Sequence, residues 1–329
     1  MNMDTFQALV LEKTGNEANL NIRQLHMDDL PEGDLTIRVA YSSVNFKDGM
    51  VAINHQLVES YPLTPGIDLA GTVIDSQDER YNEGDEVIVT SYQLGTGHSG
   101  GFSEVARVPA DWAVPLPEGL SLKEAMILGT AGFTAGLSVQ RLKDNGLEPD
   151  KGPVLVTGAT GGVGSLAVNM LAKQGYDVTA STGKTNETDY LKKMGAKNVI
   201  DRHEVEDTEQ KPVRGKKWAA AVDPVGGKTL QYILSTLSYG GSVATSGLTG
   251  GTEVSTSVLP FISRGINWLG IDSVKCPMEK RMKVWQRLAD DFKPDMHEEM
   301  VNEISLDELP NVLRDILDSN VRGRTIVKL

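Results

Sequence analysis

The chain has 329 residues, enough for about two domains. It carries 45 acidic and 32 basic side chains, and the formal net charge of −13 argues against a dedicated nucleic-acid-binding protein. The single cysteine, Cys276, excludes an internal disulfide and a cysteine-based structural zinc site. No apolar run is long enough to cross a bilayer, and the first residues lack a signal-peptide pattern, so we expect a cytoplasmic protein without membrane partners.

The first ~120 residues predict a β-rich, barrel-like domain, because short alternating apolar segments are separated by turn residues. Candidate strands are 35–40, 71–74 and 86–90. The pattern changes at Ser121, where Ser121 and Glu124 have the spacing of a capping box and predict the start of a helix. A second helix is expected from about Thr130 to Leu142.

Strands and helices alternate beyond this point, which predicts a parallel, doubly wound sheet. The expected strands are 154–157, 177–181, 198–200, 219–223, 242–245 and 268–271, and the expected helices are 165–173, 187–194 and 228–237. The tail adds two predicted helices, about 278–292 and 306–317, and a last strand, 324–328, that could return to pair with the first domain.

Glycine is frequent, with 34 residues or about 10% of the chain against a typical ~7%, and it is clustered. The strongest cluster has the spacing Gly-x-x-Gly-x-x-Gly and runs from Gly158 to Gly164, between a predicted strand and a predicted helix. Backbone N–H groups at a helix N-terminus bind pyrophosphate, and side chains at the closest positions would block its approach. The cluster therefore predicts a dinucleotide site; the alternative is a tight strand–helix turn without a ligand.

The residues after the next strand predict NADPH rather than NADH. An NAD site usually has Asp or Glu here, whereas this sequence has Ser181, Thr182, Gly183 and Lys184. A carboxylate would repel a 2′-phosphate, and a lysine would attract it. Arg202, just beyond the third strand, is a second candidate for the same phosphate; for both cations the alternative is a solvated surface side chain.

A catalytic zinc ion is not expected. Such a site needs about three His, Cys or carboxylate ligands, and the five histidines form no His-x-x-x-His pair. Cys276 stands alone in the sequence.

Several segments resemble the medium-chain dehydrogenase/reductases, and the resemblance covers nearly the whole chain. The closest likeness is to the zinc-independent quinone oxidoreductase branch and its bacterial acryloyl-CoA reductase subgroup. The segments that carry it are Asn45-Phe46-Lys47-Asp48, 65–71, 129–135, 157–164, 268–274 and Gly323-Arg324-Thr325. In the second of these, Ile67 stands where zinc alcohol dehydrogenases have a histidine ligand.

The resemblance implies a GroES-like β-barrel catalytic domain plus a Rossmann doubly wound parallel-sheet domain, in an α/β protein. We expect residues 1–124 to form the first part of the catalytic domain, 125–270 the NADPH-binding domain, and 271–329 the return to the catalytic domain. A homodimer is implied as well. The expected cofactor contacts are Phe46, Thr160, Gly161, Gly162, Val163, Thr182, Gly183, Lys184, Arg202, Leu248, Ile262, Ser273, and either Ser319 or Asn320.

The catalytic hypothesis places Asn45 and Asp48 on one face of a helical turn. Hydride transfer from NADPH to the β-carbon of a short 2-enoyl thioester would develop charge on the thioester oxygen. The Asn45 amide could donate to the substrate, and Asp48 could orient it or relay a proton. The alternative is that Asn45 and Asp48 only cap a helix. Lys47 could attract coenzyme A phosphate or be a solvated lysine.

Three functions remain open at this stage. The leading one is an NADPH-dependent reductase of acryloyl-CoA type, and the second is an NADPH:quinone oxidoreductase, which would use the same hydride and pocket. A non-catalytic NADPH-binding protein is a minor alternative.

Overall fold

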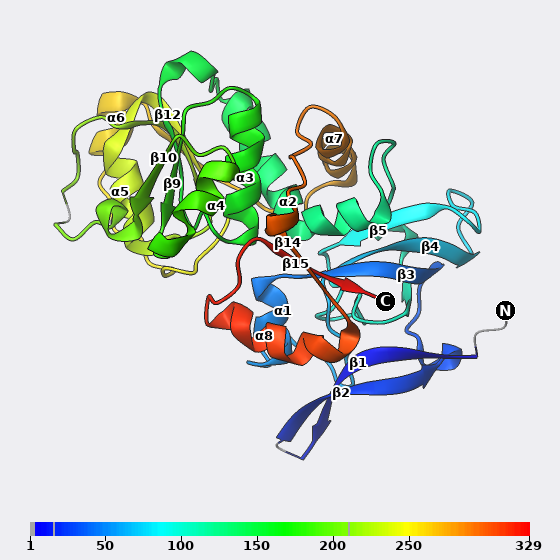
Figure 1. The fold of residues 1–329 in the computed structure, drawn as a ribbon. Coiled ribbons are helices and arrows are strands. Elements are labelled where there is room, and N and C mark those ends of the chain that lie inside the picture. The colour runs from blue at the N-terminus through cyan, green and yellow to red at the C-terminus, as the bar shows by residue number, and fades with distance from the viewer. Residues whose placement is uncertain (1–3, 16, 210) are drawn as a thin grey trace. The chain divides into compact units, whose positions relative to one another are not determined.

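The computed structural model describes residues 4–15, 17–209 and 211–329, which form two units (Figure 1). Unit 1 comprises Met1–Thr130, Val274–Ala289 and Met300–Leu329, and unit 2 comprises Ala131–Ser273 and Asp290–Glu299. The division expected from the sequence assigned 290–299 to the first domain instead. The segment belongs to unit 2 because Asp295 N–H donates to Asn169 Oδ1 at 2.9 Å and Lys173 pairs with the Asp295 carboxylate at 3.0 Å.

Unit 1 contains a mostly antiparallel sheet, in which β14 and β15 pair in parallel, and a separate two-stranded sheet of β1 and β2. Its strands are β1 (Thr5–Thr14), β2 (Glu17–His26), β3 (Leu35–Val44), β4 (Asp68–Ser76), β5 (Glu86–Thr90), β6 (Val105–Val108), β7 (Ala113–Pro115), β14 (Val301–Ile304) and β15 (Arg324–Lys328). Its helices are α1 (Phe46–Ala52), α7 (Met278–Ala289), α8 (Leu309–Leu317) and the first part of α2 (Leu122–Asp144).

The strand order in unit 1 is β14-β15-β3-β4-β5-β7, and β6 also pairs with β3. The last strand returns as expected, since β15 pairs antiparallel to β3 with Thr325 opposite Val44. Leu35, Ile37 and Val39 alternate along β3 and pack into the main core of the unit. The hairpin of β1 and β2 was not predicted, although Ala18, Leu20 and Ile22 alternate with polar residues along β2.

Helix α2 contains the two helices expected from the sequence, joined across a kink. Ser121 and Glu124 form the predicted capping box: Ser121 N–H donates to Glu124 Oε2 at 2.9 Å, and Glu124 N–H donates to Ser121 Oγ at 3.2 Å. Gly129 has φ +50° and ψ −155°, a conformation that only glycine adopts without strain, so the helix is interrupted there. The kink presents the Thr130 N–H to the interior of unit 1.

Unit 2 is a doubly wound fold, which confirms the predicted parallel sheet. Its strands are β8 (Val154–Val156), β9 (Val178–Thr182), β10 (Asn198–Asp201), β11 (Trp218–Asp223), β12 (Leu237–Thr245) and β13 (Asn267–Gly270). Its helices are α3 (Gly162–Lys173), α4 (Thr188–Lys193), α5 (Gly227–Thr236) and α6 (Leu259–Arg264). The strands are parallel in the order β10-β9-β8-β11-β12-β13.

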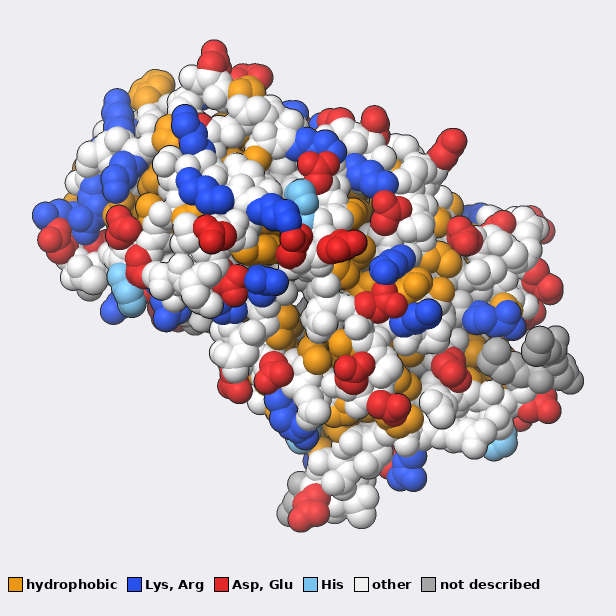
Figure 2. All heavy atoms as spheres, viewed as in Figure 1, with side chains coloured by type: hydrophobic (Ala, Val, Ile, Leu, Met, Phe, Trp, Pro, Cys, Tyr) orange, Lys and Arg blue, Asp and Glu red, His pale blue; other side chains and the backbone are white. Residues whose placement is uncertain are grey.

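Figure 2 shows acidic and basic side chains intermingled on the face in view, so the excess of acidic groups does not form one continuous field there. Within the described part of the chain, no helix combines the length and apolar character that a bilayer crossing requires.

Candidate cofactor and catalytic site

The strand order places a binding site at the carboxyl ends of β8 and β11. From β8 the chain continues outward to β9 and β10, and it then crosses to β11 on the other side of β8. This reversal is a topological switch point, where open α/β sheets bind ligands outside the carboxyl ends of their strands. The predicted glycine loop follows β8, so the sheet delivers it to this point.

Two of the three spaced glycines in the loop are required by the backbone, and a side chain at the third would have space. Gly158 has φ +54°, and a Cβ on Gly164 would collide with the Gly158 carbonyl oxygen. A Cβ on Gly161, the residue that precedes α3, would meet only that carbonyl oxygen, at 3.4 Å. The N–H groups of the first turn of α3 have no intrahelical acceptor and can bind an anion. The loop thus fits a dinucleotide pyrophosphate.

The residues predicted for the adenosine phosphate come together at the ends of β9 and β10. Thr182 Oγ1 lies 3.3 Å from Thr160 Oγ1 and accepts the Lys184 N–H at 3.0 Å. A Cβ built on Gly183 would lie 2.6 Å from Arg202 Nε, so the guanidinium group packs directly against this glycine. The Arg202 guanidinium group, from the end of β10, therefore lies against the end of β9, where Lys184 follows Gly183 in the chain.

Sequence reasoning missed Asp223, the last residue of β11. Its buried carboxylate accepts the Thr157 hydroxyl at 2.6 Å and the N–H groups of Val225 and Gly226 at 3.1 and 3.0 Å. Burial raises the pKa of Asp223, and these three donors oppose the rise. The available signal was an acid directly after an apolar strand and before Pro224-Val225-Gly226-Gly227.

The other predicted contacts of unit 2 lie on its loops and on a short helix. Leu248, 53% exposed, lies in the segment after β12, which is bonded to the turn after β11 through Gly250 N–H and Val225 O at 2.7 Å. Ile262 is exposed on α6. Ser273 is the last residue before the chain re-enters unit 1. Their predicted contact with a nicotinamide stays a prediction.

In unit 1, Asn45 and Asp48 form the start of α1. Asp48 Oδ2 accepts the Asn45 N–H at 2.8 Å, and Asp48 Oδ1 accepts the Ile67 N–H at 2.8 Å. The Asn45 amide donates to Asp68 Oδ2 at 2.8 Å. Asp48 is fully buried, so the arrangement matches the capping alternative, and a direct catalytic role stays a prediction.

Burial, followed by the charge of Asp68, raises the pKa of Asp48 to about 7. The nearby cation is Arg324, also fully buried, which donates to Asn45 Oδ1 at 3.3 Å and to Ser43 Oγ at 2.9 Å. Burial lowers the pKa of Arg324, and both carboxylates oppose that change.

Asp68 links this cluster to the kink in α2. Its side chain accepts the Ser43 hydroxyl at 2.6 Å, the Thr130 N–H at 2.8 Å and the Thr130 hydroxyl at 2.5 Å. A side chain on Gly129 would overlap this cluster, since its Cβ would lie 2.6 Å from Asp68 Oδ2. Asp68 and Arg324 thus join β3, α1, β4, α2 and β15 through side-chain bonds.

A second cluster surrounds Tyr92, just after β5. The ring of Tyr92 stacks on Trp112 with centroids 5.7 Å apart, and the Arg281 guanidinium carbon lies 4.4 Å from the centroid of the same Tyr92 ring. Ser91 and Tyr92 have φ values of +65° and +51°, a strained region for residues other than glycine. His55 and Leu57 share this conformation in the loop after α1.

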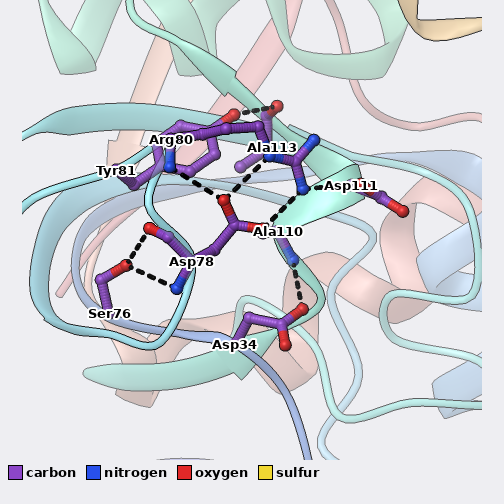
Figure 3. Close-up of polar contacts among 8 residues, drawn as sticks. All are labelled: Asp34, Ser76, Asp78, Arg80, Tyr81, Ala110, Asp111 and Ala113. Carbon is purple, nitrogen blue, oxygen red and sulfur yellow. Dashed lines mark hydrogen bonds and ion pairs between the residues drawn. The ribbon is translucent and has the colours of Figure 1, made fainter.

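Surface contacts hold the turn that carries Trp112 (Figure 3). Arg80 bridges Asp78 at 2.8 Å and Asp111 at 2.7 Å, and Ala110 N–H donates to Asp34 Oδ2 at 3.0 Å. Hydrogen bonds from Arg80 lower the pKa of Asp78 to about 2.

The remaining contacts predicted in unit 1 are Phe46 and Ser319. Phe46 is the first residue of α1. This helix packs closely against α8: a Cβ added to Gly49 would lie only 2.9 Å from the carbonyl oxygen of Leu313. Ser319, with φ +59°, follows the end of α8. The contact of Ser319 or Asn320 with the cofactor stays a prediction.

Among the described residues, no group of three or more His, Cys, Asp or Glu side chains is arranged to hold a metal ion.

Comparisons with known proteins match both units. Residues 31–118 match the family model described as alcohol dehydrogenase GroES-like domain, and residues 162–290 match the one described as zinc-binding dehydrogenase. The chain is 56% identical to "Putative quinone oxidoreductase YhfP" of Bacillus subtilis over 98% of this chain and 99% of that protein. It is 47% identical to the acrylyl-CoA reductase AcuI of Ruegeria pomeroyi, over 98% of each.

Solved structures of similar proteins match this chain over nearly its whole length. The structure of B. subtilis yhfP with NAD bound has a TM-score of 0.96 and covers 99% of both chains. The structure of Escherichia coli K-12 YhdH with bound NADPH is 44% identical, has a TM-score of 0.94 and covers 98% of this chain and 99% of that one.

Proposed function

Because the chain belongs to the medium-chain dehydrogenase/reductase family, in the group that includes YhfP and AcuI, we propose that it is an NADPH-dependent reductase of short 2-enoyl thioesters. The observation that carries the substrate class is the 47% identity to an acrylyl-CoA reductase over nearly the whole chain. The observation that supports the cofactor is the packing of the Arg202 guanidinium group against Gly183, next to Lys184 in the chain and with no carboxylate directly after β9. We place the enzyme in the cytoplasm.

In this reaction NADPH supplies a hydride to the β-carbon of the thioester, and a proton adds to the α-carbon, giving the saturated thioester and NADP⁺. On the protein side, the glycine loop and the first turn of α3 hold the pyrophosphate, and Thr182, Lys184 and Arg202 hold the adenosine phosphate. From unit 2, Leu248, Ile262 and Ser273 border the nicotinamide half in this proposal. Correct placement of donor and acceptor supplies much of the rate.

Asn45 and Asp48 act in this proposal mainly by fixing α1, which begins at Phe46. Their polar groups are engaged within unit 1, and Asp48 has no exposed surface. The strained residues Ser91, Tyr92, His55 and Leu57 support a substrate-binding role for the two loops that carry them, since such strain clusters at functional sites. These loops touch through Glu59 N–H and Thr96 O at 3.3 Å.

We propose that the reaction is independent of zinc, although one matching family model is named for zinc binding. Ile67 offers no ligand atom where zinc relatives have histidine. The neighbouring acid, Asp68, is occupied by donors from Ser43, Asn45 and Thr130.

The decisive experiment compares acryloyl-CoA with 1,4-benzoquinone as acceptors for NADPH. We expect acryloyl-CoA to have the higher kcat/KM, with the saturated thioester as product. A higher kcat/KM for the quinone would instead support the second candidate, which the name of the 56% identical relative favours. Tight NADPH binding without turnover of either acceptor would indicate a non-catalytic binding protein.

The homodimer is proposed to form at β13, the edge strand of the unit 2 sheet. An edge strand has unpaired backbone groups that can pair with a second copy across a two-fold axis. Two exposed apolar side chains support this surface: Trp268 on β13, and Val258, 69% exposed, just before α6, which packs on the neighbouring strand β12.

Replacing Val258 with aspartate is expected to shift the protein from dimer to monomer, because a charge would be buried at the dyad. Size-exclusion chromatography with light scattering measures the mass. Leu57→Asp, at an exposed leucine of unit 1, is the matched control and should leave the mass unchanged. A wild-type monomer at micromolar concentration would rule the dimer out.

A further inference from the structure

Three segments that follow β8, β11 and β12 meet around one buried carboxylate. Asp223, at the end of β11, accepts the hydroxyl of Thr157, the first residue after β8, at 2.6 Å. Its other oxygen accepts Gly226 N–H at 3.0 Å, which fixes the turn after β11. The Ser246 N–H, just after β12, donates to the main-chain oxygen of Asp223 at 3.0 Å.

The turn after β11 and the segment after β12 pack backbone against backbone. A Cβ on Gly226 would lie 2.8 Å from Gly251 O, and side chains on Gly227 or Gly247 would overlap the carbonyls of Gly250 and Pro224. Gly250 N–H also donates to Val225 O at 2.7 Å. These glycines serve the close approach of two loops, so any displacement of the turn after β11 is transmitted to residues 246–251.

We propose that Asp223 is a positioning residue that locks the glycine loop and the Leu248 segment to one another through Thr157. The proposal rests on the proposed function, in which the glycine loop holds the pyrophosphate and the Leu248 segment borders the nicotinamide. Asp223 itself contacts neither group. It fixes the distance between the two halves of the cofactor site, which decides where the nicotinamide is presented.

The chemistry of the carboxylate explains why an acid stands here. Asp223 receives three donors on two oxygens, and it offers no proton in return when ionised. In asparagine, one of the two carboxylate oxygens is replaced by an NH₂ group, which cannot accept a hydrogen bond. That group would face either the Gly226 N–H or the donors of Thr157 and Val225. Asp223→Asn therefore breaks at least one link while preserving the volume of the side chain.

The test uses Thr157→Val, which removes the hydroxyl but keeps the β-branched shape, together with Thr157→Ser, which keeps the hydroxyl. NADPH binding is titrated by fluorescence, and 2′,5′-ADP is used as a probe that carries the 2′- and 5′-phosphates of adenosine but lacks the nicotinamide half. Asp223→Asn is measured in parallel, and kcat and KM for acryloyl-CoA are obtained for each variant.

We expect Thr157→Val to weaken NADPH binding roughly three- to tenfold, the range for one lost hydrogen bond. Binding of 2′,5′-ADP should stay at the wild-type value, and Thr157→Ser should restore NADPH binding. Asp223→Asn should lower kcat more than Thr157→Val does, because it also releases the turn that holds the Leu248 segment.

Equal weakening of 2′,5′-ADP and NADPH by Thr157→Val would overturn the proposal, because it would show a general structural loss. Unchanged NADPH binding in Thr157→Val would overturn it too. If Asp223→Asn does not fold, the valine and serine pair still decides the question. Failure of the proposed function is seen separately, as wild-type protein that binds NADPH but does not reduce acryloyl-CoA.

Discussion

Unit 1 is expected to lose stability as the pH rises from about 4 to about 7, because Asp48 must ionise inside its core. The pKa of this carboxyl is about 7 in the folded protein against an ordinary value of 3.8, so between these values the folded state binds the extra proton. Stability that depends on the bound proton is complete below the lower value and is lost as the pH passes the upper one. The shift corresponds to about 4 kcal/mol of unfolding free energy.

Asp48→Asn tests this expectation, because the variant keeps the size of the side chain and removes its titration. The free energy of opening is measured from hydrogen exchange of peptides that cover β3 and α1, for both proteins at each pH. Between pH 5 and pH 7, we expect the unfolding free energy of the variant to rise relative to that of the wild type by about 2 kcal/mol. Hydrogen bonds lost in the variant change the free-energy difference between the two proteins by the same amount at every pH. The dependence of that difference on pH is therefore unaffected.

Asp78→Asn is the matched control, because the pKa of Asp78 is lowered to about 2 by hydrogen bonds from Arg80. A carboxyl with a lowered pKa contributes stability that is lost only as the pH falls below its ordinary value. The Asp78 variant should therefore show no change relative to the wild type between pH 5 and pH 7. A flat profile for Asp48→Asn over the same range would contradict the titration of Asp48.

The sequence predicted the alternating strands and helices of unit 2 because their patterns are local. A buried strand, a glycine-rich turn and a helix start are each readable within about ten residues, and the right-handed order of parallel strands then follows from connection rules. The kink at Gly129 was also readable, since two helical patterns abut there. The hairpin of β1 and β2 was missed, although the apolar residues Ala18, Leu20 and Ile22 alternate with polar ones in β2 and the pattern was equally local.

The buried polar clusters could not be predicted in the same way, because their partners come from distant segments. Asp68 is bonded to Thr130, 62 positions later, and Arg324 to Ser43, 281 positions earlier. Nothing near Asp68 in the sequence indicates that its partner will be the amide exposed by a helix kink. Asp223 shows the same limit, since its role depends on Thr157, 66 positions away.

The cations at the ends of β9 and β10 are expected to decide between NADPH and NADH. Arg202→Ala should weaken NADPH binding by about 1.5–3 kcal/mol, the range for hydrogen bonds to a charged group, which is roughly ten- to hundredfold in Kd. Lys184→Ala should cost ~1–3 kcal/mol for the same reason. NADH has no 2′-phosphate, so its Kd should be unchanged in both variants. Fluorescence titration with each nucleotide gives the four constants.

Two further variants test whether Arg202 and Lys184 contact the 2′-phosphate directly or act only through the overall charge of the protein. Lys197, an exposed lysine that precedes β10, lies at the opposite end of that strand from Arg202, so Lys197→Ala removes the same charge away from the proposed phosphate and should leave both constants unchanged. Gly183→Ala keeps every charge, yet its methyl group would overlap the Arg202 side chain and displace it. This variant should therefore weaken NADPH selectively as well. Equal weakening of NADH and NADPH, or a loss in Lys197→Ala as large as in Arg202→Ala, would mean that the two cations act through overall charge and do not hold the 2′-phosphate.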